Sequence, residues 1–517
     1  MEHSQIWIVD FGSQYTQLIT RKTRELGYSS SILTFEDAVT EINSGKRPKA
    51  IVLSGGPESI FEDKNDYTSI FKDDTVPILG ICYGMQLMAH YHGGKVQRGS
   101  RGEYGLSSVE FEPTLKMEHV PQKINVWMSH FDHVSEIPPQ FNLLCHSRND
   151  FVAGIIHENL PIMGLQFHPE VKHTDHGQDI LQYFFSELAG LSKDWNQQMM
   201  FDQCKEVVSV AQGDSVLCAF SGGVDSLVAA TMAATVLKDN LYCFFVDNGL
   251  LRPQDHHHIQ ILKEQTNLNI EIIQASDLFL EKLKGVDEPE KKRKIIGNTF
   301  IEVFEEKVHE FERDHGINFK WLLQGTLYPD VIESLSPHKK GGKSHTIKSH
   351  HNVGGLPERM HLKLIEPLKF LFKDEVRELG EAMSLKHEWV HRHPFPGPGI
   401  GVRVLGEIKP ESIKKVQDSD QILFEELKNY GLYHATWQAF TVLLPVKTVG
   451  VKGDARAFEE VICLRLVNST DGMTANWTEL PYDFLAHVSY RITNEVAGVT
   501  RVVYDITSKP PGTIEWE

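Results

Sequence analysis

The chain has 517 residues, too many for a single hydrophobic core, and a usual domain length of about 150 residues predicts roughly three domains. Lys and Arg total 52 and Asp and Glu total 70, so the net charge of −18 disfavours a nucleic-acid partner, whose phosphates it would repel. The 6 cysteines form no CxxC pair, the first residues do not form a secretory signal, and no apolar run reaches the roughly 18 residues of a membrane span. We therefore expect a cytoplasmic protein with no membrane partner.

Residues 1–191 alternate short apolar runs with helical patterns. The runs IWIVDF, AIVLSGG and VPILGIC are typical of buried parallel strands that each end in a turn. A polar segment that begins a new helix starts at Gly190 and marks a domain boundary. The pattern predicts a first doubly wound α/β domain over 1–191.

A second α/β pattern occupies residues 192–392. Its apolar runs SVLCAFSGG, NLYCFFVDNG, NIEIIQAS and KWLLQGT are separated by helical patterns, which predicts βαβ units and another doubly wound sheet. The basic, aperiodic stretch SPHKKGGKSHTIKSHHNVGGLPERM interrupts this pattern, and we expect it to be a mobile loop.

The last segment, residues 393–517, begins with HPFPGPGIG, which is too rich in Pro and Gly for the interior of a helix or strand. After this stretch, the helical pattern PESIKKVQDSDQILFEELKNYG is followed by the strand patterns VICLRLV and TRVVYDI. These elements predict a small α+β domain.

Cys82 lies in the stretch PILGICYGMQLMAHYHGG, between a predicted strand and a predicted helix. Gly80 and Gly84 flank it and permit a sharp turn, as in a nucleophile elbow with Cys in place of Ser. A helix N-terminus beneath the sulfur favours the thiolate. A buried structural cysteine in a strand-turn-helix is the alternative.

His168 and Glu170 lie two residues apart in GLQFHPEV, so on an extended segment they point the same way. With Cys82 they form a candidate triad in which His168 takes the thiol proton and Glu170 orients His168. The Gly-rich turn LSGGPES could add backbone N–H groups to that of Tyr83 in an oxyanion hole, although an ordinary turn explains its glycines equally well.

These residues resemble a class I glutamine amidotransferase domain, with GGPES, GICYGMQ and FHPE in the family's order. The resemblance implies glutamine hydrolysis through a Cys82 thioester with release of ammonia. It also implies an oxyanion hole at Gly56 and Tyr83, and places Gln86 at the glutamine pocket. The chain departs from the family at Phe131, where Gly is usual.

The stretch SGGVDS, from Ser221 to Ser226, follows a predicted strand and opens a predicted helix. Its consecutive N–H groups could form an anion nest at the helix N-terminus, although the Lys of a nucleotide P-loop is missing. Asp225 is then a candidate for Mg²⁺ binding or for capping the helix. A capped glycine turn is the alternative without function.

The same stretch resembles the pyrophosphatase loop of the N-type ATP pyrophosphatases, which cut ATP between the α and β phosphates and adenylate an oxygen. The resemblance implies that ATP or pyrophosphate contacts Ser221, Gly222, Gly223, Val224, Asp225, Ser226 and Leu227. Leu227 departs from the usual Ser. Val246, near the end of the next strand, is a candidate for the nucleoside edge, or only a buried strand end.

Nearly the whole chain resembles the glutamine-hydrolysing GMP synthetase family, through DEPEKKRKIIG, QGTLYPDVIES, IKSHHNVGGLP, HPFPGPG, VGVKGDAR and SKPPGTIEWE. The resemblance implies that XMP, ATP and glutamine are the substrates, that Mg²⁺ accompanies ATP, and that the last domain forms a homodimer. It assigns XMP contacts to Arg293, Lys509 and Glu515 and a lid role to Lys348. DGMTANW departs from the family's usual DFMTADW.

Charge supports two of the XMP contacts, because Arg293 and Lys509 suit a 5′-phosphate. For the neighbouring lysines, Lys291, Lys292 and Lys294, we expect a solvated basic surface. We expect the same for the run DHHH, Asp255 to His258, since three adjacent His cannot share one helix face to bind a metal.

Three other functions fit part of the pattern. A tRNA-thiolating enzyme uses the same pyrophosphatase loop, but needs a cysteine pair and a basic RNA surface. NAD or asparagine synthesis is nearer, although the terminal SKPPGTIEWE argues against it. A binding protein without catalysis is disfavoured by the intact set Cys82, His168 and Glu170.

Overall fold

The structure is a computed structural model that describes residues 4–99, 102–113, 117–335, 361–469 and 474–517. The basic segment 336–360, predicted to be a mobile loop, lies outside the described residues, and so does Lys348 within it. The chain divides into two compact units, Met1–Met199 and Met200–Glu517. The first boundary predicted from the sequence, at 191/192, precedes this division at 199/200.

The first unit contains a nine-stranded sheet in the order β2-β1-β3-β4-β11-β10-β9-β6-β7, of which the first five strands are parallel. The predicted parallel strands are confirmed, but the antiparallel extension from β11 to β7 was not predicted. The strands are β1 (Ile6–Asp10), β2 (Ser30–Thr34), β3 (Ala50–Leu53), β4 (Ile78–Ile81), β6 (Glu103–Phe111), β7 (Lys123–His130), β9 (Phe141–Ser147), β10 (Val152–His157) and β11 (Ile162–Leu165). A separate ribbon pairs β5 (Lys95–Gln97) with β8 (His133–Glu136).

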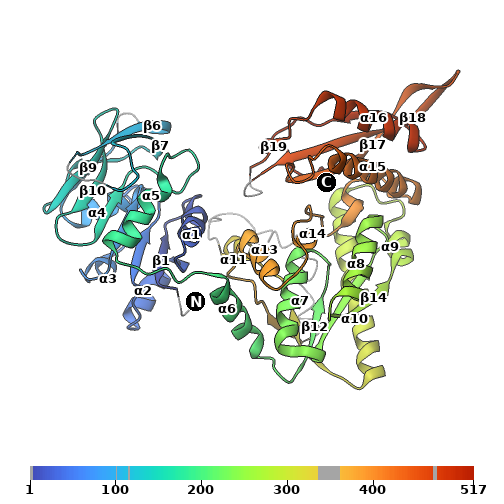
Figure 1. The fold of residues 1–517 in the computed structure, drawn as a ribbon, viewed down its shortest axis with the longest axis horizontal. Coiled ribbons are helices and arrows are strands. Elements are labelled where there is room, and N and C mark those ends of the chain that lie inside the picture. The colour runs from blue at the N-terminus through green and yellow to red at the C-terminus, as the bar shows by residue number, and fades with distance from the viewer. Residues whose placement is uncertain (1–3, 100–101, 114–116, 336–360, 470–473) are drawn as a thin grey trace. The chain divides into compact units, whose positions relative to one another are not determined.

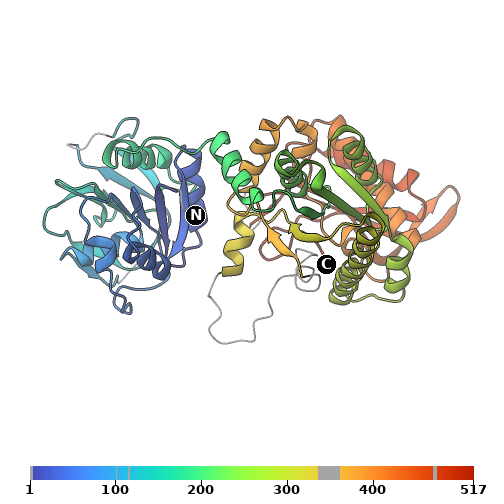
Figure 2. The ribbon, with the colours of Figure 1, turned by 90° about the horizontal axis from the view of Figure 1, so that it is seen from below.

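The central parallel strands of this sheet, such as β3 and β4, are buried on both faces, which explains their continuously apolar sequences. Along β1, Ile6 and Ile8 belong to one apolar cluster and Trp7 and Val9 to another. Helices lie on either side of the sheet (Figure 1, Figure 2). They are α1 (Thr16–Glu25), α2 (Phe35–Asn43), α3 (Thr68–Phe71), α4 (Tyr83–Tyr91), α5 (Gly177–Gln182) and the π-helical turn η1 (Tyr183–Leu188).

The second unit begins within α6 (Gln197–Ser209) and holds a parallel sheet in the order β14-β13-β12-β15-β16. The chain moves from the central strand β12 to one edge and then returns to β15 on its other side. This reversal creates a topological switch point at the carboxyl end of β12, where open α/β sheets bind ligands. The strands are β12 (Ser215–Ala219), β13 (Leu241–Asp247), β14 (Asn269–Gln274), β15 (Phe319–Leu323) and β16 (Lys363–Ile365).

The helices around this sheet complete the predicted second doubly wound fold. They are α7 (Val224–Leu237), α8 (Pro253–Gln265), α9 (Ser276–Leu283), α10 (Pro289–His315), α11 (Tyr328–Leu335), α13 (Lys373–Ala382) and α14 (His387–Val390), with the 3₁₀ turns η2 (Lys238–Asn240) and η3 (Gly399–Val402). The final α+β part consists of α15 (Pro410–Asn429), β17 (Gln438–Lys452), β18 (Ala455–Asn468), β19 (Asn476–Trp477), α16 (Tyr482–Glu495) and β20 (Val499–Tyr504).

The α+β part and the parallel sheet share one apolar core. Leu217 of β12 and Phe304 of α10 belong to the same buried cluster as Leu423 of α15 and Ile492 of α16. The chain from 200 to 517 is thus one compact unit, and a domain boundary at 392/393 stays a prediction. The β17–β18 hairpin extends away from this body (Figure 1).

A buried ion network crosses the predicted boundary inside the second unit. The Asp255 carboxylate accepts hydrogen bonds from Arg252 at 2.8 and 3.0 Å and from Arg392 at 2.6 Å. Arg403 donates to Asp420 at 3.4 Å, and Arg252 lies 3.9 Å from the same carboxylate. Burial opposes ionisation of Asp255, but the charges of Arg252 and Arg392 and the hydrogen bonds from Arg252 together outweigh it and hold the Asp255 pKa below its usual range. Removing one partner from such a network typically lowers the free energy of unfolding by about 3–5 kcal/mol.

The expectation that the run DHHH is a solvated surface is wrong for Asp255 and His258. Both side chains are buried, whereas His257 is exposed. The reason is the face of α8 on which each residue lies, because Asp255 and His258 are one turn apart and face the protein. His258 hydrogen-bonds the backbone of Gly222, so part of this run supports the SGGVDS loop.

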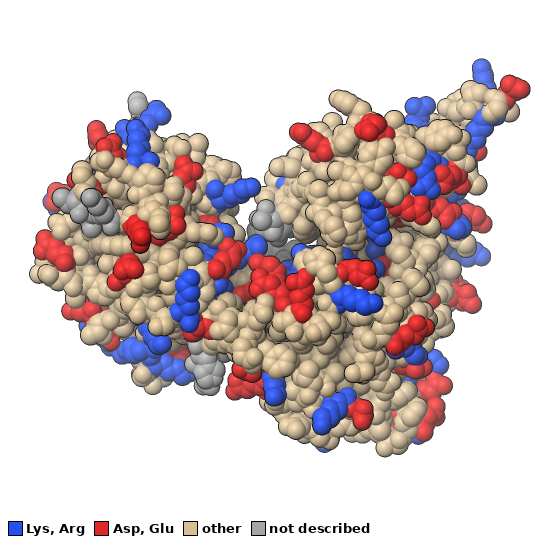
Figure 3. Space-filling view, in the orientation of Figure 1, with Lys and Arg blue, Asp and Glu red and all other residues tan. Residues whose placement is uncertain are grey.

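The surface carries charges of both signs. On the face shown in Figure 3, Lys and Arg side chains lie among Asp and Glu side chains over both units. This mixture differs from the continuous basic stripe of a nucleic-acid site. No helix among the described residues has the length and apolar character needed to cross a bilayer.

Two buried histidines predict a pH dependence of folding stability. Burial lowers the pKa of both His258 and His393 to about 4. In the unfolded chain each ring titrates near its ordinary pKa of about 6.5, so between pH 6.5 and 4 the unfolded state binds more protons. We therefore expect the free energy of unfolding of the second unit to fall as the pH falls through this window, measured by urea denaturation.

A His393→Gln variant should flatten this dependence, since glutamine can still donate to the Tyr433 carbonyl, which accepts from His393 Nε2 at 2.8 Å. His309→Gln, on the exposed face of α10, is the matched control and should keep the wild-type slope. Parallel loss of stability in all three chains would contradict the assignment.

Candidate active sites

Cys82 stands in a sharp turn between β4 and α4 with φ 54° and ψ −107°. A non-glycine residue in this region is strained, and such strain is typical of a nucleophile elbow. Neighbouring glycines make the turn possible by close packing. A Cβ on Gly84 would lie 2.4 Å from the Leu53 carbonyl oxygen, and a Cβ on Gly80 would lie 2.7 Å from the Gly84 carbonyl. The helix N-terminus therefore sits directly against the strand ends.

The structure brings the predicted triad together. His168 Nδ1 lies 2.7 Å from Glu170 Oε1, and His168 also hydrogen-bonds Cys82. All three side chains are buried. Burial favours the neutral imidazole, but the Glu170 charge and the hydrogen bonds to Cys82 and Glu170 outweigh it and hold the His168 pKa well above its usual value. His168 can thus take and keep the thiol proton.

Glu170 is placed to act through its charge. Its second oxygen, Oε2, is buried and has no hydrogen-bond partner. A buried carboxylate with an unpaired oxygen is costly unless a cation forms beside it. The imidazolium of His168 is that cation, so the pair stabilises the state that follows proton transfer from Cys82.

The two predicted oxyanion donors lie in two turns, one after each of the neighbouring parallel strands β3 and β4. Tyr83 is the first residue of α4, so its N–H has no acceptor within the helix. Gly56 follows β3, and a Cβ there would lie 2.8 Å from the Phe11 carbonyl oxygen. The Tyr83 side chain points elsewhere, since its hydroxyl donates to Asp63. Only the backbone of Tyr83 is available for an oxyanion.

The Gln86 side chain supports the site through two hydrogen bonds. Its Nε2 donates to the Asp132 carbonyl at 2.7 Å and to Gln166 Oε1 at 3.3 Å. Gln166 Nε2 in turn lies 3.7 Å from Cys82 Sγ. Our sequence reasoning missed Gln166, although a signal was present, because Gln166, His168 and Glu170 alternate in one short segment and can share a face.

The departure at Phe131 leaves this geometry intact. Phe131 is not among the residues with positive φ, so its backbone does not require glycine, and its side chain is half exposed. The next residue, Asp132, is held on both sides. Its carbonyl accepts from Gln86 and lies 3.0 Å from His130 Nδ1, and its carboxylate accepts from Ser59 at 2.5 Å.

The SGGVDS loop lies at the switch point, between the end of β12 and the start of α7. Gly222 has φ +71°, and a Cβ there would meet Ile259 Cδ1 at 2.2 Å, so the loop requires glycine. The Ser221 and Ser226 hydroxyls lie 3.0 Å apart, and Ser226 also donates to the Gly223 carbonyl at 3.0 Å. The loop is therefore ordered before a ligand arrives.

Asp225 does not cap α7, because Gly223 is the N-cap and no side chain caps this helix. Instead both Asp225 oxygens accept hydrogen bonds from Lys373 Nζ at 2.6 Å. Lys373 begins α13 and was not singled out from the sequence. It brings to this loop the positive charge that a nucleotide P-loop takes from its own lysine. Gly325, after β15, packs against the Asp225 backbone, with its Cβ position 2.9 Å from the Asp225 carbonyl carbon.

Three predicted ATP contacts have apolar side chains. Val224, Leu227 and Val246 are all buried, and Val246 lies in the core of the unit. The Leu227 N–H already donates to the Gly223 carbonyl at 2.9 Å. Leu227 therefore has no donor left for a phosphate, and its contact with ATP stays a prediction that geometry does not support.

The C-terminal tail reaches α10, where Arg293 lies. Arg293 donates to the Glu517 backbone carbonyl, and Lys292 Nζ lies 2.6 Å from Glu517 Oε2 and donates to the Val404 carbonyl at 2.7 Å. The expectation that Lys292 belongs to a solvated surface is wrong, since the tail and the η3 region cover it completely. Lys291 and Lys294 are exposed, as predicted.

Glu515 and Lys509 are held by other residues of the tail region. The Glu515 carboxylate accepts from Arg403 at 2.9 and 3.2 Å and from Gln438 at 2.8 Å. The backbone of Lys509 pairs with Ala475. Arg465 fixes the tail by donating to the carbonyls of Thr507 and Thr513 at 2.6 and 2.9 Å.

Three family descriptions match this chain. Residues 7–188 match Glutamine amidotransferase class-I, residues 215–317 match the Phosphoadenosine phosphosulfate reductase domain, and residues 425–516 match GMP synthase C terminal domain. The first match includes Cys82, His168 and Glu170, and the second includes SGGVDS.

Curated relatives match over the full length. A glutamine-hydrolysing GMP synthase of Chlorobaculum tepidum is 49% identical over 525 residues, covering 99% of this chain and 98% of the relative. Those of Aquifex aeolicus and Thermosipho melanesiensis are each 48% identical, with 100% and 99% of both chains covered, respectively. The chain belongs to the glutamine-hydrolysing GMP synthase family. This membership decides against the tRNA-thiolating, NAD-forming and asparagine-forming alternatives.

The Lys373–Asp225 contact predicts a role for Lys373 in the ATP-dependent half of a GMP synthase. Lys373→Met removes the charge and keeps most of the chain length, so we expect XMP-dependent pyrophosphate release, with ammonium as donor, to fall tenfold or more. Lys386→Met is the matched control, because its exposed ammonium makes no contact with the SGGVDS loop among the described residues and instead bonds Gln265 Oε1 at 2.7 Å and lies 5.0 Å from the centre of the Trp389 ring. Equal rates in both variants would rule out the role.

Proposed function

We propose that this chain makes GMP from XMP, with glutamine as nitrogen donor and ATP as the activating substrate. The observation that carries the proposal is the pairing, within one family member, of an intact Cys82–His168–Glu170 triad with an ordered anion nest at Ser221–Ser226. The first can release ammonia, and the second can hold the pyrophosphate of an adenylation. The products are GMP, AMP, pyrophosphate and glutamate.

In the glutaminase step, the Cys82 sulfur attacks the amide carbon of glutamine while His168 takes the thiol proton. The N–H groups of Tyr83 and Gly56 receive the oxyanion, and His168 passes its proton to the departing ammonia. Water then hydrolyses the thioester with His168 as base. Gln86 and Gln166 keep the sulfur and the Asp132 loop in place.

In the ATP-dependent step, the O2 oxygen of XMP attacks the α-phosphate and pyrophosphate departs. Backbone N–H groups of the nest and the hydroxyls of Ser221 and Ser226 bind the leaving pyrophosphate. Lys373 can turn from Asp225 to the phosphates, because its side chain is 40% exposed. Ammonia then displaces AMP from the activated carbon.

Mg²⁺ fits this site through Asp225, whose two carboxylate oxygens are hard ligands. Those oxygens now face the Lys373 ammonium, which would repel a divalent cation. Asp225 would therefore hold Mg²⁺ when Lys373 moves to the phosphates. When bound, Mg²⁺ supplies neutralisation of phosphate charge.

For XMP we propose Arg293 and Lys509 at the 5′-phosphate and Glu515 at the base. The contact between Arg293 and the terminal residue Glu517 supports a role for the tail, because it joins the first of these residues to the segment that carries the other two. Lys348 is proposed as the lid lysine from the family likeness alone. We also propose that the reaction takes place in the cytoplasm.

Replacing Cys82 separates the two half-reactions. We expect Cys82→Ala to lose GMP formation with glutamine by a factor of 10³ or more, because the nucleophile is gone, and to keep GMP formation with ammonium within about twofold. The measurement is GMP formed from XMP and Mg-ATP with either donor. Absence of GMP with both donors in the wild type would refute the substrate assignment.

We further propose a homodimer formed through the β17–β18 hairpin. Val449 and Phe458 are paired across the hairpin and lie on one face with Val451, and their side chains are 59%, 66% and 74% exposed. An apolar face of this kind on an extended hairpin marks an interaction site. A second copy of the chain covers it in this proposal.

A double variant, Val451→Lys with Phe458→Lys, should shift the chain from dimer to monomer because it places charges on the apolar face. Light scattering after size exclusion measures the mass. Tyr482→Lys, an exposed aromatic on α16, is the control and should leave the dimer intact. A monomeric wild type, or a dimer that survives the double variant, would exclude this interface.

A further inference from the structure

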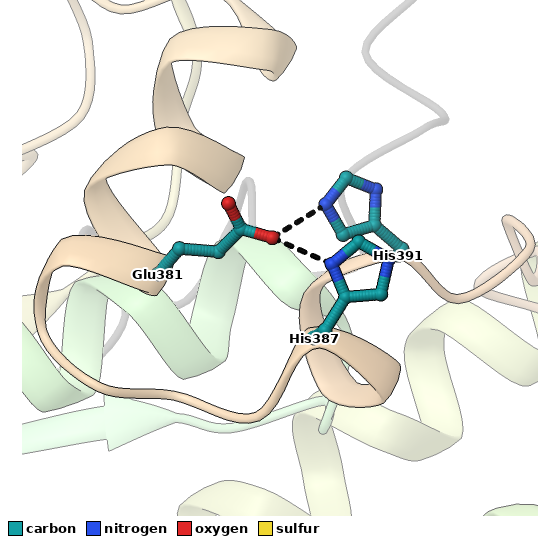
Figure 4. A group of neighbouring side chains, drawn as sticks. All are labelled: Glu381, His387 and His391. Atoms are coloured by element: carbon teal, nitrogen blue, oxygen red, sulfur yellow. Dashed lines mark hydrogen bonds and ion pairs between the residues drawn. The ribbon is translucent and has the colours of Figure 1, made fainter.

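Three metal-ligating side chains meet at one point of the second unit, apart from the residues assigned above. Glu381 lies near the end of α13, and His387 and His391 lie at the start of α14 and directly after it. Glu381 Oε1 is 2.7 Å from His387 Nδ1 and 3.0 Å from His391 Nε2 (Figure 4). Among the described residues, this is the one group of three such side chains whose ligand atoms lie within 4.8 Å of one another.

The local sequence holds the two imidazoles side by side. The stretch His387-Glu388-Trp389-Val390-His391 places its histidines four residues apart, which is the spacing of neighbours on one helix face. Their rings stack with centroids 4.0 Å apart. In zinc hydrolases, His-Glu-x-x-His on a helix supplies two metal ligands in this way. Here the carboxylate that meets both rings comes from Glu381, on a different helix.

The opposite face of α14 anchors the group. Trp389 and Val390 are buried, and a Cβ on Gly380 would lie 2.8 Å from Val390 Cγ1, so glycine lets α13 and α14 approach closely. This packing fixes the backbone on both sides of the cluster. The Glu381, His387 and His391 side chains remain 43%, 66% and 30% exposed, so an ion has access from solvent.

We propose that Glu381, His387 and His391 bind Zn²⁺. Two imidazole nitrogens and one carboxylate oxygen are an established protein donor set for zinc, with a solvent molecule as fourth ligand. Tetrahedral bonds of about 2.0–2.1 Å separate neighbouring ligand atoms by about 3.4 Å, so the His387 and His391 nitrogens need to move only about 0.7 and 0.4 Å farther from Glu381 Oε1. Mg²⁺ and Ca²⁺ prefer sets made only of oxygen.

In the metal-free state, hydrogen atoms on the two imidazole nitrogens that face Glu381 occupy the place that zinc would take. A carboxylate only accepts hydrogen bonds, so His387 Nδ1 and His391 Nε2 donate to it in the metal-free state. On binding, each ring coordinates through that nitrogen and carries its hydrogen on the other. The ion then joins the end of α13 to α14 and stabilises the turn between them. Since α13 begins at Lys373, the ion would fix the helix that serves the SGGVDS loop, without taking part in the reaction.

The test is zinc binding to the full-length chain without a polyhistidine tag. A Cys82→Ser background removes the catalytic thiolate as a competing ligand. We expect one tight zinc per chain by chelator competition, visible absorption typical of low coordination number when Co²⁺ is used instead, and a rise in Tm with zinc. Glu381→Gln, His387→Gln and His391→Gln should each weaken zinc binding at least tenfold and abolish the Tm rise.

Two histidine variants outside the proposed zinc site serve as controls. His434→Gln alters a ring that lies 6.1 Å from that of His387, and His309→Gln alters a pair with one carboxylate on α10. Both should keep the wild-type affinity. Circular dichroism without zinc would show that the variants of Glu381, His387 and His391 are folded. Zinc binding that is absent in the wild type, or equal in all five variants, overturns the proposal whether or not the chain makes GMP.

Discussion

The close approach of a helix N-terminus to the end of a parallel strand is the constraint on which both sites depend. At Cys82, the turn from β4 to α4 leaves no space for a side chain on Gly80 or Gly84. At the second site, Gly222 meets Ile259, and Gly325 meets the backbone of Asp225. In each case the absent side chains let backbone N–H groups face a ligand, a sulfur or an oxyanion, with the favourable end of the helix dipole behind them.

Charge is placed in these sites by residues from other elements. Glu170 keeps one buried oxygen unpaired, so that a cation on His168 is stabilised. Lys373 brings to SGGVDS the cation that the loop lacks. Deeper in the second unit, each buried carboxylate of the Arg252 network faces at least one guanidinium, and the tail ends on Lys292. These pairings fix the relative positions of α8, α13, α15 and the tail around the predicted nucleotide site.

The sequence predicted the elements best where a motif is contiguous. The parallel strands, the elbow at Cys82, the His168–Glu170 pair and the glycine loop each occupy a few adjacent residues, and their geometry follows from local backbone rules. Predictions about exposure were weaker. Lys292, Asp255 and His258 were expected at the surface, yet the fold covers them, because helical position alone does not say which face will meet another element. The antiparallel strands from β6 to β10 were also missed, since their pattern is less continuously apolar.

The amino-acid sequence alone determined which chemistry this protein can perform, because a nucleophile, a base and an anion nest are defined by residue type and short spacing. Only the tertiary structure decided which distant groups complete them. Lys373 meets Asp225 across 148 residues of chain, and Glu517 meets Lys292 across 225. Gln86 meets Gln166 across 80. No local pattern encodes such pairs, since side chains far apart in the chain become neighbours only when burial of apolar surface brings their elements together.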